Sequence, residues 1–197
     1  MNRASSRNPP QKKRRARFRI PTPDNLANVA LYYLGRFAAS EGSLRRVLEN
    51  RVRRAAMVHP DFAADSAGQE KLREAIGRII AQHKKSGALN DAAFADMKAN
   101  SLRRAGRSQR RIAQQLRHKG IAKDLIERAL SPEDGEDPES AEKKAALVFA
   151  RRRKLGPYRK EPSSADQRRK DLAVMGRAGF TYDIVRQVLG EDTDDCD

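Results

Sequence analysis

The side chains best suited to chemistry in this sequence are arginines and lysines, which gather in two stretches. Residues 98–119 hold eight positive residues and no Asp or Glu, and residues 151–170 form a second concentration. Because a guanidinium fork pairs bidentately with carboxylate or phosphate, both stretches favour docking on a polyanion or on acidic protein patches. The candidate binding residues are Arg103, Arg104, Arg107, Arg110, Arg111, Arg117, Lys119, Arg151, Arg152, Arg153, Arg168 and Arg169.

A simpler interpretation of these charges is a solvated helix face, since charge runs on helices usually are that. Phe149 and Tyr158 are the aromatic residues near the basic stretches. Base stacking, which single-strand binders build on interleaved aromatic residues, therefore has little support. We expect any contact with nucleic acid to be made mainly with phosphates.

The overall composition agrees with a polyanionic neighbour. The 197 residues include 42 Lys and Arg against 26 Asp and Glu, which gives a formal net charge of +16. Only 38% of the residues are hydrophobic and there is no Trp, so one large core is not expected.

Signatures of catalysis are missing from the sequence. It has no P-loop, no dinucleotide-type glycine loop and no G-x-S-x-G turn. His59, His83 and His118 are far apart, and the one cysteine, Cys196, has no partner for a disulfide or a thiolate site. We expect neither an enzyme nor a cofactor nor a bound metal.

The distribution of apolar residues also predicts a cytoplasmic protein. The uncharged stretch near the start that includes residues 26–35 is about half of the ~20 residues that cross a bilayer. The basic first nineteen residues are not followed by the apolar segment of a secretory signal.

Apolar residues recur at helical spacing along most of the chain. The clearest case is residues 26–37, where Thr22 and the following proline mark the start of a helix. Further helices are expected through residues 44–52 and 72–80, joined by a loop over 58–68. No alternating run long enough for a strand occurs, so the fold class is predicted to be all-α.

A comparison of the sequence with itself reveals a repeat. Residues 111–130 align without gaps on 170–189, and Gly120 then meets Gly179, each followed by a large apolar residue. A glycine can end a helix at positive φ while the next residue packs back on the last turn. With a preceding helix, each copy has three helices, and a more diverged copy can be laid on residues 24–86.

These observations predict an elongated, curved tandem array of three three-helix repeats. The expected divisions are a disordered basic arm (1–21), repeat 1 (22–88), repeat 2 (89–131), an acidic linker (132–140), repeat 3 (141–190) and an acidic tail (191–197).

Four motifs in order resemble the RecX family of regulatory proteins. They are Ala30-Leu31-x-x-Leu34 with Ser40-x-x-x-Leu44-x-x-x-Leu48, Leu89-Asn90-Asp91, Gly106-x-Ser108-x-x-Arg111-Ile112-x-x-x-Leu116-x-x-Lys119-Gly120-Ile121, and Ala178-Gly179-Phe180-x-Tyr182-Asp183. The resemblance implies a cytosolic, monomeric bacterial protein that binds the RecA recombinase filament and mostly inhibits its recombination, ATPase and coprotease activities, with roles in DNA repair and the SOS response. The family has no catalytic residues to carry over.

Two other classes of function stay open at this point. Residues 108–130 superficially resemble a helix-turn-helix DNA binder, although the position four after Ala113 is Arg117 and the turn waits until Gly120. A non-specific basic nucleic-acid-binding protein, acting through residues 1–19, is the other.

Overall fold

The computed structural model describes residues 19–131, 137–160 and 164–190, and those residues form helices and no strand. The all-α prediction is therefore confirmed. The chain divides into two compact units, residues 1–90 and 91–197. Most of the expected basic arm, part of the expected acidic linker and the expected acidic tail lie outside the described residues.

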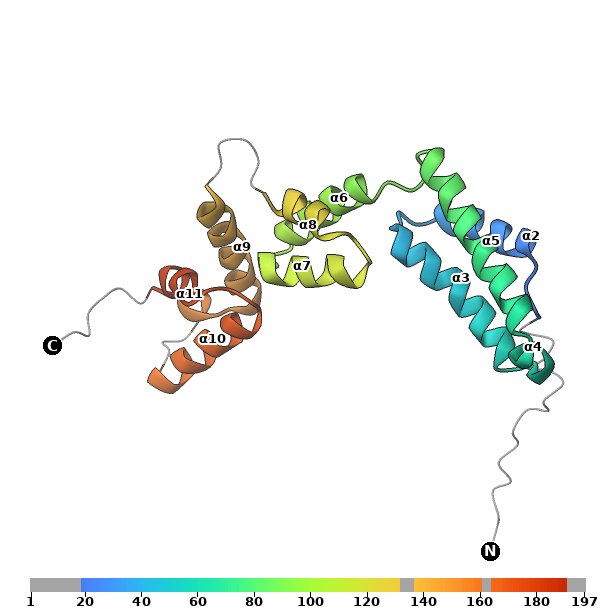
Figure 1. Cartoon of the computed structure of the whole chain (residues 1–197). Coiled ribbons are helices and arrows are strands. Elements are labelled where there is room, and N and C mark those ends of the chain that lie inside the picture. The colour runs from blue at the N-terminus through green and yellow to red at the C-terminus, as the bar shows by residue number, and fades with distance from the viewer. Residues whose placement is uncertain (1–18, 132–136, 161–163, 191–197) are drawn as a thin grey trace, which may run out of the picture. The chain divides into compact units, whose positions relative to one another are not determined.

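The first unit contains α2 (Pro23–Leu34), α3 (Glu41–Ala56), α4 (Pro60–Ala64) and α5 (Ser66–Lys85) (Figure 1). The start of α2 is as predicted: the Thr22 hydroxyl accepts a hydrogen bond from the Asn25 N–H, and Pro23 is the first helical residue. The helices meet through fully or nearly fully buried residues that include Leu26, Leu44 and Ile76.

The loop expected over residues 58–68 is wrong, because most of that segment is helical. Pro60 opens the short helix α4, whose Phe62 is buried in the core of the unit. The Asp65 carboxylate then accepts a hydrogen bond from the Gly68 N–H at 2.8 Å and starts α5. The buried Phe62 ring, the helix-opening Pro60 and the capping Asp65 thus give helical structure where a loop was expected, and the segment expected to hold three helices has four.

The second unit contains α6 (Asp91–Arg104), α7 (Gln109–His118) and α8 (Lys123–Leu130), followed by α9 (Pro138–Arg153), the 3₁₀ turn η1 (Gly156–Tyr158), α10 (Ala165–Arg177) and α11 (Tyr182–Leu189). The first three helices enclose one cluster of buried residues, which includes Ile112 and Leu116. The remaining elements enclose another, which includes Met175 and Phe180. The helix α9 begins at Pro138, inside the range expected for the acidic linker, because the Asp137 carboxylate caps it by accepting from the Ser140 N–H.

Both glycine junctions predicted from the repeat adopt the expected backbone. Gly120 has φ +82° and Gly179 has φ +96°. The N–H of Ile121 donates to the Leu116 carbonyl at 3.2 Å and that of Phe180 to the Met175 carbonyl at 3.3 Å, which closes the last helical turn. Ile121 and Phe180 are both buried, so the apolar residue after each glycine does pack back on its helix.

Two features are absent from the described residues. None of their helices combines the length and the apolar character needed to pass through a bilayer. Among the same residues, no three His, Cys, Asp or Glu side chains come together as candidate ligands for a metal ion.

Candidate polyanion-binding surface on the second unit

All of the predicted binding residues belong to the second unit, so the packing of its helices decides which of them meet. The helix α9 closes against the turn between α6 and α7. The carboxylate of Glu142 accepts hydrogen bonds from the Gln109 N–H at 3.1 and 3.2 Å, and the Arg152 guanidinium donates to the Ala105 carbonyl at 3.0 Å. One contact holds α9 to the start of the α6–α7 turn, at Ala105, and the other holds it to the end of that turn, at Gln109.

The turn between α6 and α7 approaches α9 so closely that it needs a glycine. Gly106 has φ +75°, and a Cβ at this position would lie 2.8 Å from the Phe149 backbone nitrogen and 3.1 Å from the Ala145 carbonyl oxygen. Because those neighbours are backbone atoms of a helix, they cannot move aside. The close approach brings the basic residues after Gly106 next to those at the end of α9.

Ser108 links the same turn to the second glycine junction. Its hydroxyl caps α7 by accepting from the Arg111 N–H at 3.3 Å and donates to the Ala178 carbonyl at 2.6 Å. Ser108 is fully buried, and a Cβ on Gly179 would lie 2.6 Å from the Ser108 hydroxyl oxygen. The C-terminal end of α10 is therefore held directly against the start of α7.

A hollow of about 330 Å³ lies where these elements meet, and we call it the arginine hollow. It is lined by Gly106, Arg107, Arg111, Phe149, Arg153, Val174, Arg177 and Ala178. Its four arginines come from the α6–α7 turn, from α7 and from the last turns of α9 and α10. The fold thus gathers basic residues that are up to seventy positions apart in the sequence.

A second hollow, of about 240 Å³, lies against the opposite part of α9. It is lined by Asn100, Arg103, Arg104, Ala141, Lys144, Ala145 and Val148. Arg103 is half-buried here, because its guanidinium donates to the Asn100 side chain at 3.0 Å and to the Leu130 carbonyl at 3.3 Å. Arg103 therefore holds α6 against the end of α8, and its replacement would disturb the packing of these helices.

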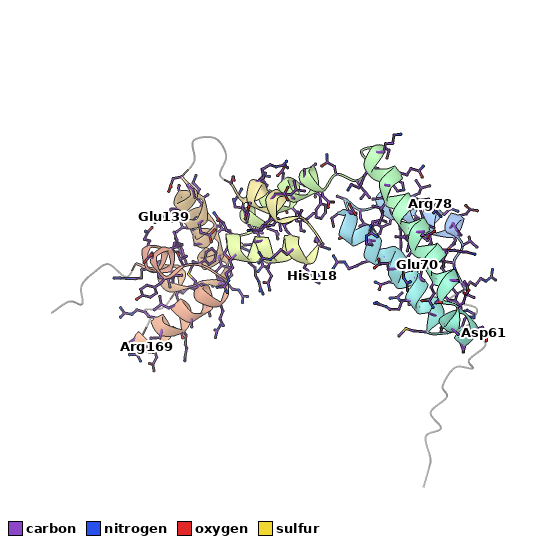
Figure 2. All side chains as sticks on the ribbon, in the orientation of Figure 1. Asp61, Glu70, Arg78, His118, Glu139 and Arg169 are labelled. Carbon is purple, nitrogen blue, oxygen red and sulfur yellow. The ribbon has the colours of Figure 1, made fainter. Side chains whose placement is uncertain are left out.

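The remaining predicted residues line neither hollow. Arg110 and Arg117 are exposed on α7, and Arg168 and Arg169 are exposed on α10, where Figure 2 shows Arg169 near the start of the helix. The Arg151 guanidinium lies over the Tyr158 ring, 5.3 Å from the centre of the ring. Lys119 is half-buried and follows the last residue of α7, His118.

The four arginines of the arginine hollow differ from those arginines of the described surface that pair with acidic side chains. Such pairs join Arg73 to Glu70 at 2.6 Å and Arg128 to Asp96 at 2.9 Å. Within the described residues, no carboxylate lies within ion-pairing distance of any of the four arginines of the hollow. Their charges are thus left for solvent or for an anionic ligand.

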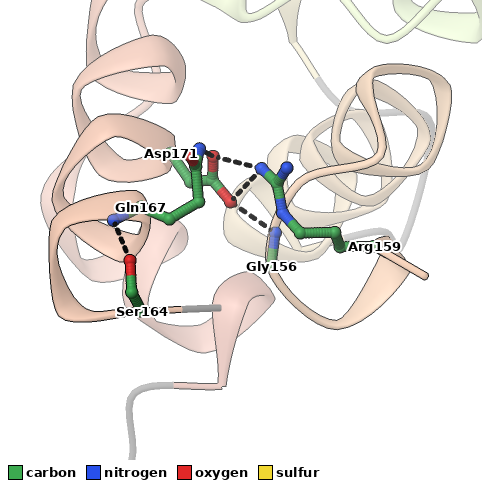
Figure 3. Close-up of polar contacts among 5 residues, drawn as sticks. All are labelled: Gly156, Arg159, Ser164, Gln167 and Asp171. Carbon is green, nitrogen blue, oxygen red and sulfur yellow. Dashed lines mark hydrogen bonds and ion pairs between the residues drawn. The ribbon is translucent and has the colours of Figure 1, made fainter. Parts of the chain in front are cut away.

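The buried carboxylate of Asp171 holds the turn η1 and the following Arg159 against α10, the helix that carries Arg177 (Figure 3). This carboxylate accepts from the Gly156 N–H at 2.8 Å, from the Arg159 guanidinium at 2.9 and 3.1 Å and from the Gln167 amide at 3.0 Å. Burial by itself would raise the pKa of Asp171, but the hydrogen bonds and the positive charge of Arg159 outweigh it and lower the pKa.

Glu142, which holds the start of α7, has the opposite balance. Removal of its carboxylate from water raises its pKa, and this effect exceeds the opposing effects of the Gln109 N–H and the charge of Arg103. A charged group is thus kept partly buried in order to satisfy the first N–H of α7.

Two basic residues of these hollows, Arg177 and Lys144, were not predicted from the sequence. Arg177 stands outside the two basic stretches, but in the self-alignment it falls on His118, so a basic residue precedes the glycine in both copies. That correspondence could have revealed it. Lys144 follows the acidic Glu142 closely and carries no comparable signal.

Fold and surface together define a protein built of small helical bundles with an unneutralised basic face. A family model described as RecX, second three-helix domain, matches residues 90–130, which are the residues of α6, α7 and α8 with one preceding residue. The Regulatory protein RecX of Myxococcus xanthus is 38% identical over 184 residues, which cover 92% of this chain and 94% of the relative.

Two further relatives have the same name. The Regulatory protein RecX of Agrobacterium fabrum is 33% identical over 110 residues, 56% of each chain. That of Chromobacterium violaceum is 30% identical over 132 residues, 67% of this chain and 75% of the relative. The chain belongs to the RecX family, as the motifs of the sequence indicated.

Proposed function

We propose that this protein is a regulator, not an enzyme, that binds the RecA recombinase filament in the cytoplasm and mostly inhibits its recombination, ATPase and coprotease activities. The observation that carries the proposal is the similarity to Regulatory protein RecX over more than nine-tenths of both chains. The unneutralised arginines of the second unit support it, since a filament on DNA presents acidic protein surface and phosphates in a regular series.

The mechanism we propose is avidity. A RecA filament repeats the same surface along its length, and three tandem helical repeats in one chain engage successive copies of it. Each contact after the first forms at high effective concentration, so modest individual contacts add up to firm binding. No deep pocket for a single small substrate is required.

The experiment is RecA-dependent ATP hydrolysis on single-stranded DNA, with and without the full chain. We expect the rate of hydrolysis to fall as the protein is added, and an unchanged rate would contradict the proposal. The Arg104→Glu, Arg107→Glu, Arg110→Glu variant reverses three exposed charges and should lose most of the inhibition. The matched Lys variant at the same three positions keeps the charges and should retain more of it, because charge attraction survives while bidentate pairing is lost.

The same preparation separates this function from sequence-specific DNA binding. A helix-turn-helix regulator would select one duplex sequence from a random pool. A filament regulator should select none and should act on RecA whatever the sequence of the DNA.

A further inference from the structure

The arginine hollow brings four guanidinium groups into one concave site, and nothing in the described part of the chain neutralises them. Like charges gathered in this way repel one another, so the arrangement costs stability in the free protein. An anion in the hollow would remove that cost.

For two of the four arginines, Arg153 and Arg177, the sequence explains why no acid is present. On α9, the positions three and four before Arg153 are Ala150 and Phe149, and on α10 those before Arg177 are Val174 and Ala173. Helical neighbours at this spacing are the usual acidic partners of surface arginines. Each helix thus delivers its arginine to the hollow without a counter-ion.

Most of the donors of these arginines are also free for a ligand. Arg111 gives one N–H to the Gln114 side chain at 2.7 Å, and the Arg153 guanidinium lies 5.9 Å from the centre of the Phe149 ring. A guanidinium has five N–H donors, so both residues can still form a bidentate pair with an oxyanion.

We infer that the arginine hollow binds the phosphodiester backbone of single-stranded nucleic acid, independently of its base sequence. The hollow of about 330 Å³ equals the volume of about ten water molecules, which accommodates backbone phosphates with some of their water. Phe149, the one aromatic residue of its lining, is buried, so the hollow offers phosphate contacts and no exposed ring on which a base could stack.

An acidic peptide is the competing ligand, since carboxylates also pair with arginine. Peptide docking draws most of its energy from side chains anchored in desolvated apolar pockets. Among the residues of the lining, the apolar ones are small, buried or partly buried, and the exposed side chains are the four arginines. The chemistry of the site therefore favours the phosphodiester. This inference goes beyond the proposed function, because the binding needs no RecA.

The test measures the affinity of the full chain for a fluorescent single-stranded oligonucleotide by anisotropy over a range of salt concentrations. The test variant is Arg111→Gln with Arg177→Gln, and the control is Lys71→Gln with Lys143→Gln, which removes the same charge from exposed positions outside the hollow and outside the predicted binding residues. Circular dichroism checks that both remain helical.

We expect the test variant to bind about tenfold more weakly or worse, because each arginine gives up a charge-assisted hydrogen bond. Its slope of log K against log salt should fall in magnitude by about 1.4, which corresponds to two single-strand phosphates. The control should change affinity and slope much less. Equal losses in both variants would show that general charge is responsible, and the inference would be overturned.

Three further arms distinguish the ligands. Two oligonucleotides of different base composition should bind alike, and strong preference for one would contradict a backbone site. Polyglutamate should compete poorly with the oligonucleotide for the full chain. If the chain instead binds polyglutamate but not DNA, and the test variant weakens that binding, the hollow binds acidic protein and the inference is overturned. If the test variant loses DNA binding but still inhibits RecA, the inference holds and the proposed regulatory function does not depend on DNA binding by the hollow. If the test variant binds DNA normally but no longer inhibits RecA, the inference is contradicted and the proposed regulatory function is not.

Discussion

The hydroxyl of Ser108 donates a hydrogen bond to the backbone carbonyl of Ala178 across 2.6 Å, although the two residues are seventy positions apart. The same hydroxyl accepts the Arg111 N–H and so caps α7. One small side chain therefore both starts a helix and fixes the end of α10 beside it. The relative placement of Arg111 and Arg177 in the arginine hollow depends on this contact.

Replacing Ser108 should loosen this junction. Ser108→Ala removes a helix cap, at a cost of about 1 kcal/mol, and leaves the partly buried Ala178 carbonyl without its donor, at about another 1 kcal/mol. Native-state amide hydrogen exchange should show faster opening of α7 and of the end of α10. Ser164→Ala is the control, because Ser164 caps α10 by accepting from the Gln167 N–H and is exposed. A destabilisation no larger than that of the control would contradict the proposed double role.

Gly179→Ala should disrupt the same junction from the other side. The substitution meets two costs, a φ of +96° that disfavours any Cβ and a contact of 2.6 Å with the Ser108 hydroxyl oxygen. We expect a loss of about 2 to 4 kcal/mol in the free energy of unfolding of the second unit.

The control is Gly190→Ala, where φ is +77° and a Cβ would have nothing within 4 Å. It incurs the backbone cost alone, about 1 kcal/mol. The comparison, made by urea denaturation, isolates the steric contribution of the junction, and equal losses would mean that the close packing on Ser108 contributes nothing.

Asp171 should make the second unit sensitive to acid. Its pKa is lower in the folded chain than the ordinary value of about 4, so the unfolded chain takes up a proton first as the pH falls. The stabilisation is therefore fully present above about pH 4 and is lost as the pH drops through the lowered pKa.

Asp171→Asn should cost about 2 to 3 kcal/mol at neutral pH, because it leaves Arg159 without its buried partner. The difference from the unsubstituted protein should shrink in acid, where both carry a neutral side chain. Asp166→Asn is the control, since its ion pair with Arg169 is long, at 4.0 Å, and exposed. A difference that stays constant from neutral to acid pH would refute the assignment.

Glu142 should act in the opposite direction. Its pKa is raised in the folded chain, so the folded chain takes up a proton first, and its contribution to stability is lost as the pH rises through that raised value. Glu142→Gln keeps a side-chain oxygen for the Gln109 N–H and removes the buried charge.

We expect the Glu142→Gln variant to gain stability relative to the unsubstituted protein as the pH rises above about 4. Denaturation curves at several pH values measure this, with Glu139→Gln on the same helix as the control for net charge. If the variant instead loses stability relative to the unsubstituted protein as the pH rises, the charged form of the Glu142 carboxylate stabilises the fold and the prediction is wrong.

Much of the local structure could be read from short stretches of the chain. Thr22 and Pro23 mark the start of α2, and Gly120 and Gly179 end their helices at positive φ, because caps and terminating glycines act within one helical turn. The segment around Phe62 could not be read correctly, because a five-residue helix is stabilised by one buried ring and leaves little periodicity.

The basic residues of the candidate site could be predicted from the sequence, but which of them lie together in space could not. The sequence by itself determined most of the helices, the repeat and the excess of arginine, since these depend on residue types and near neighbours. Only the tertiary structure decided that Arg107, Arg111, Arg153 and Arg177 share one hollow while Arg103 bonds to the backbone of α8. Helical periodicity decides on which face of its helix a side chain lies. Packing between segments that are distant in the sequence decides which of these faces meet.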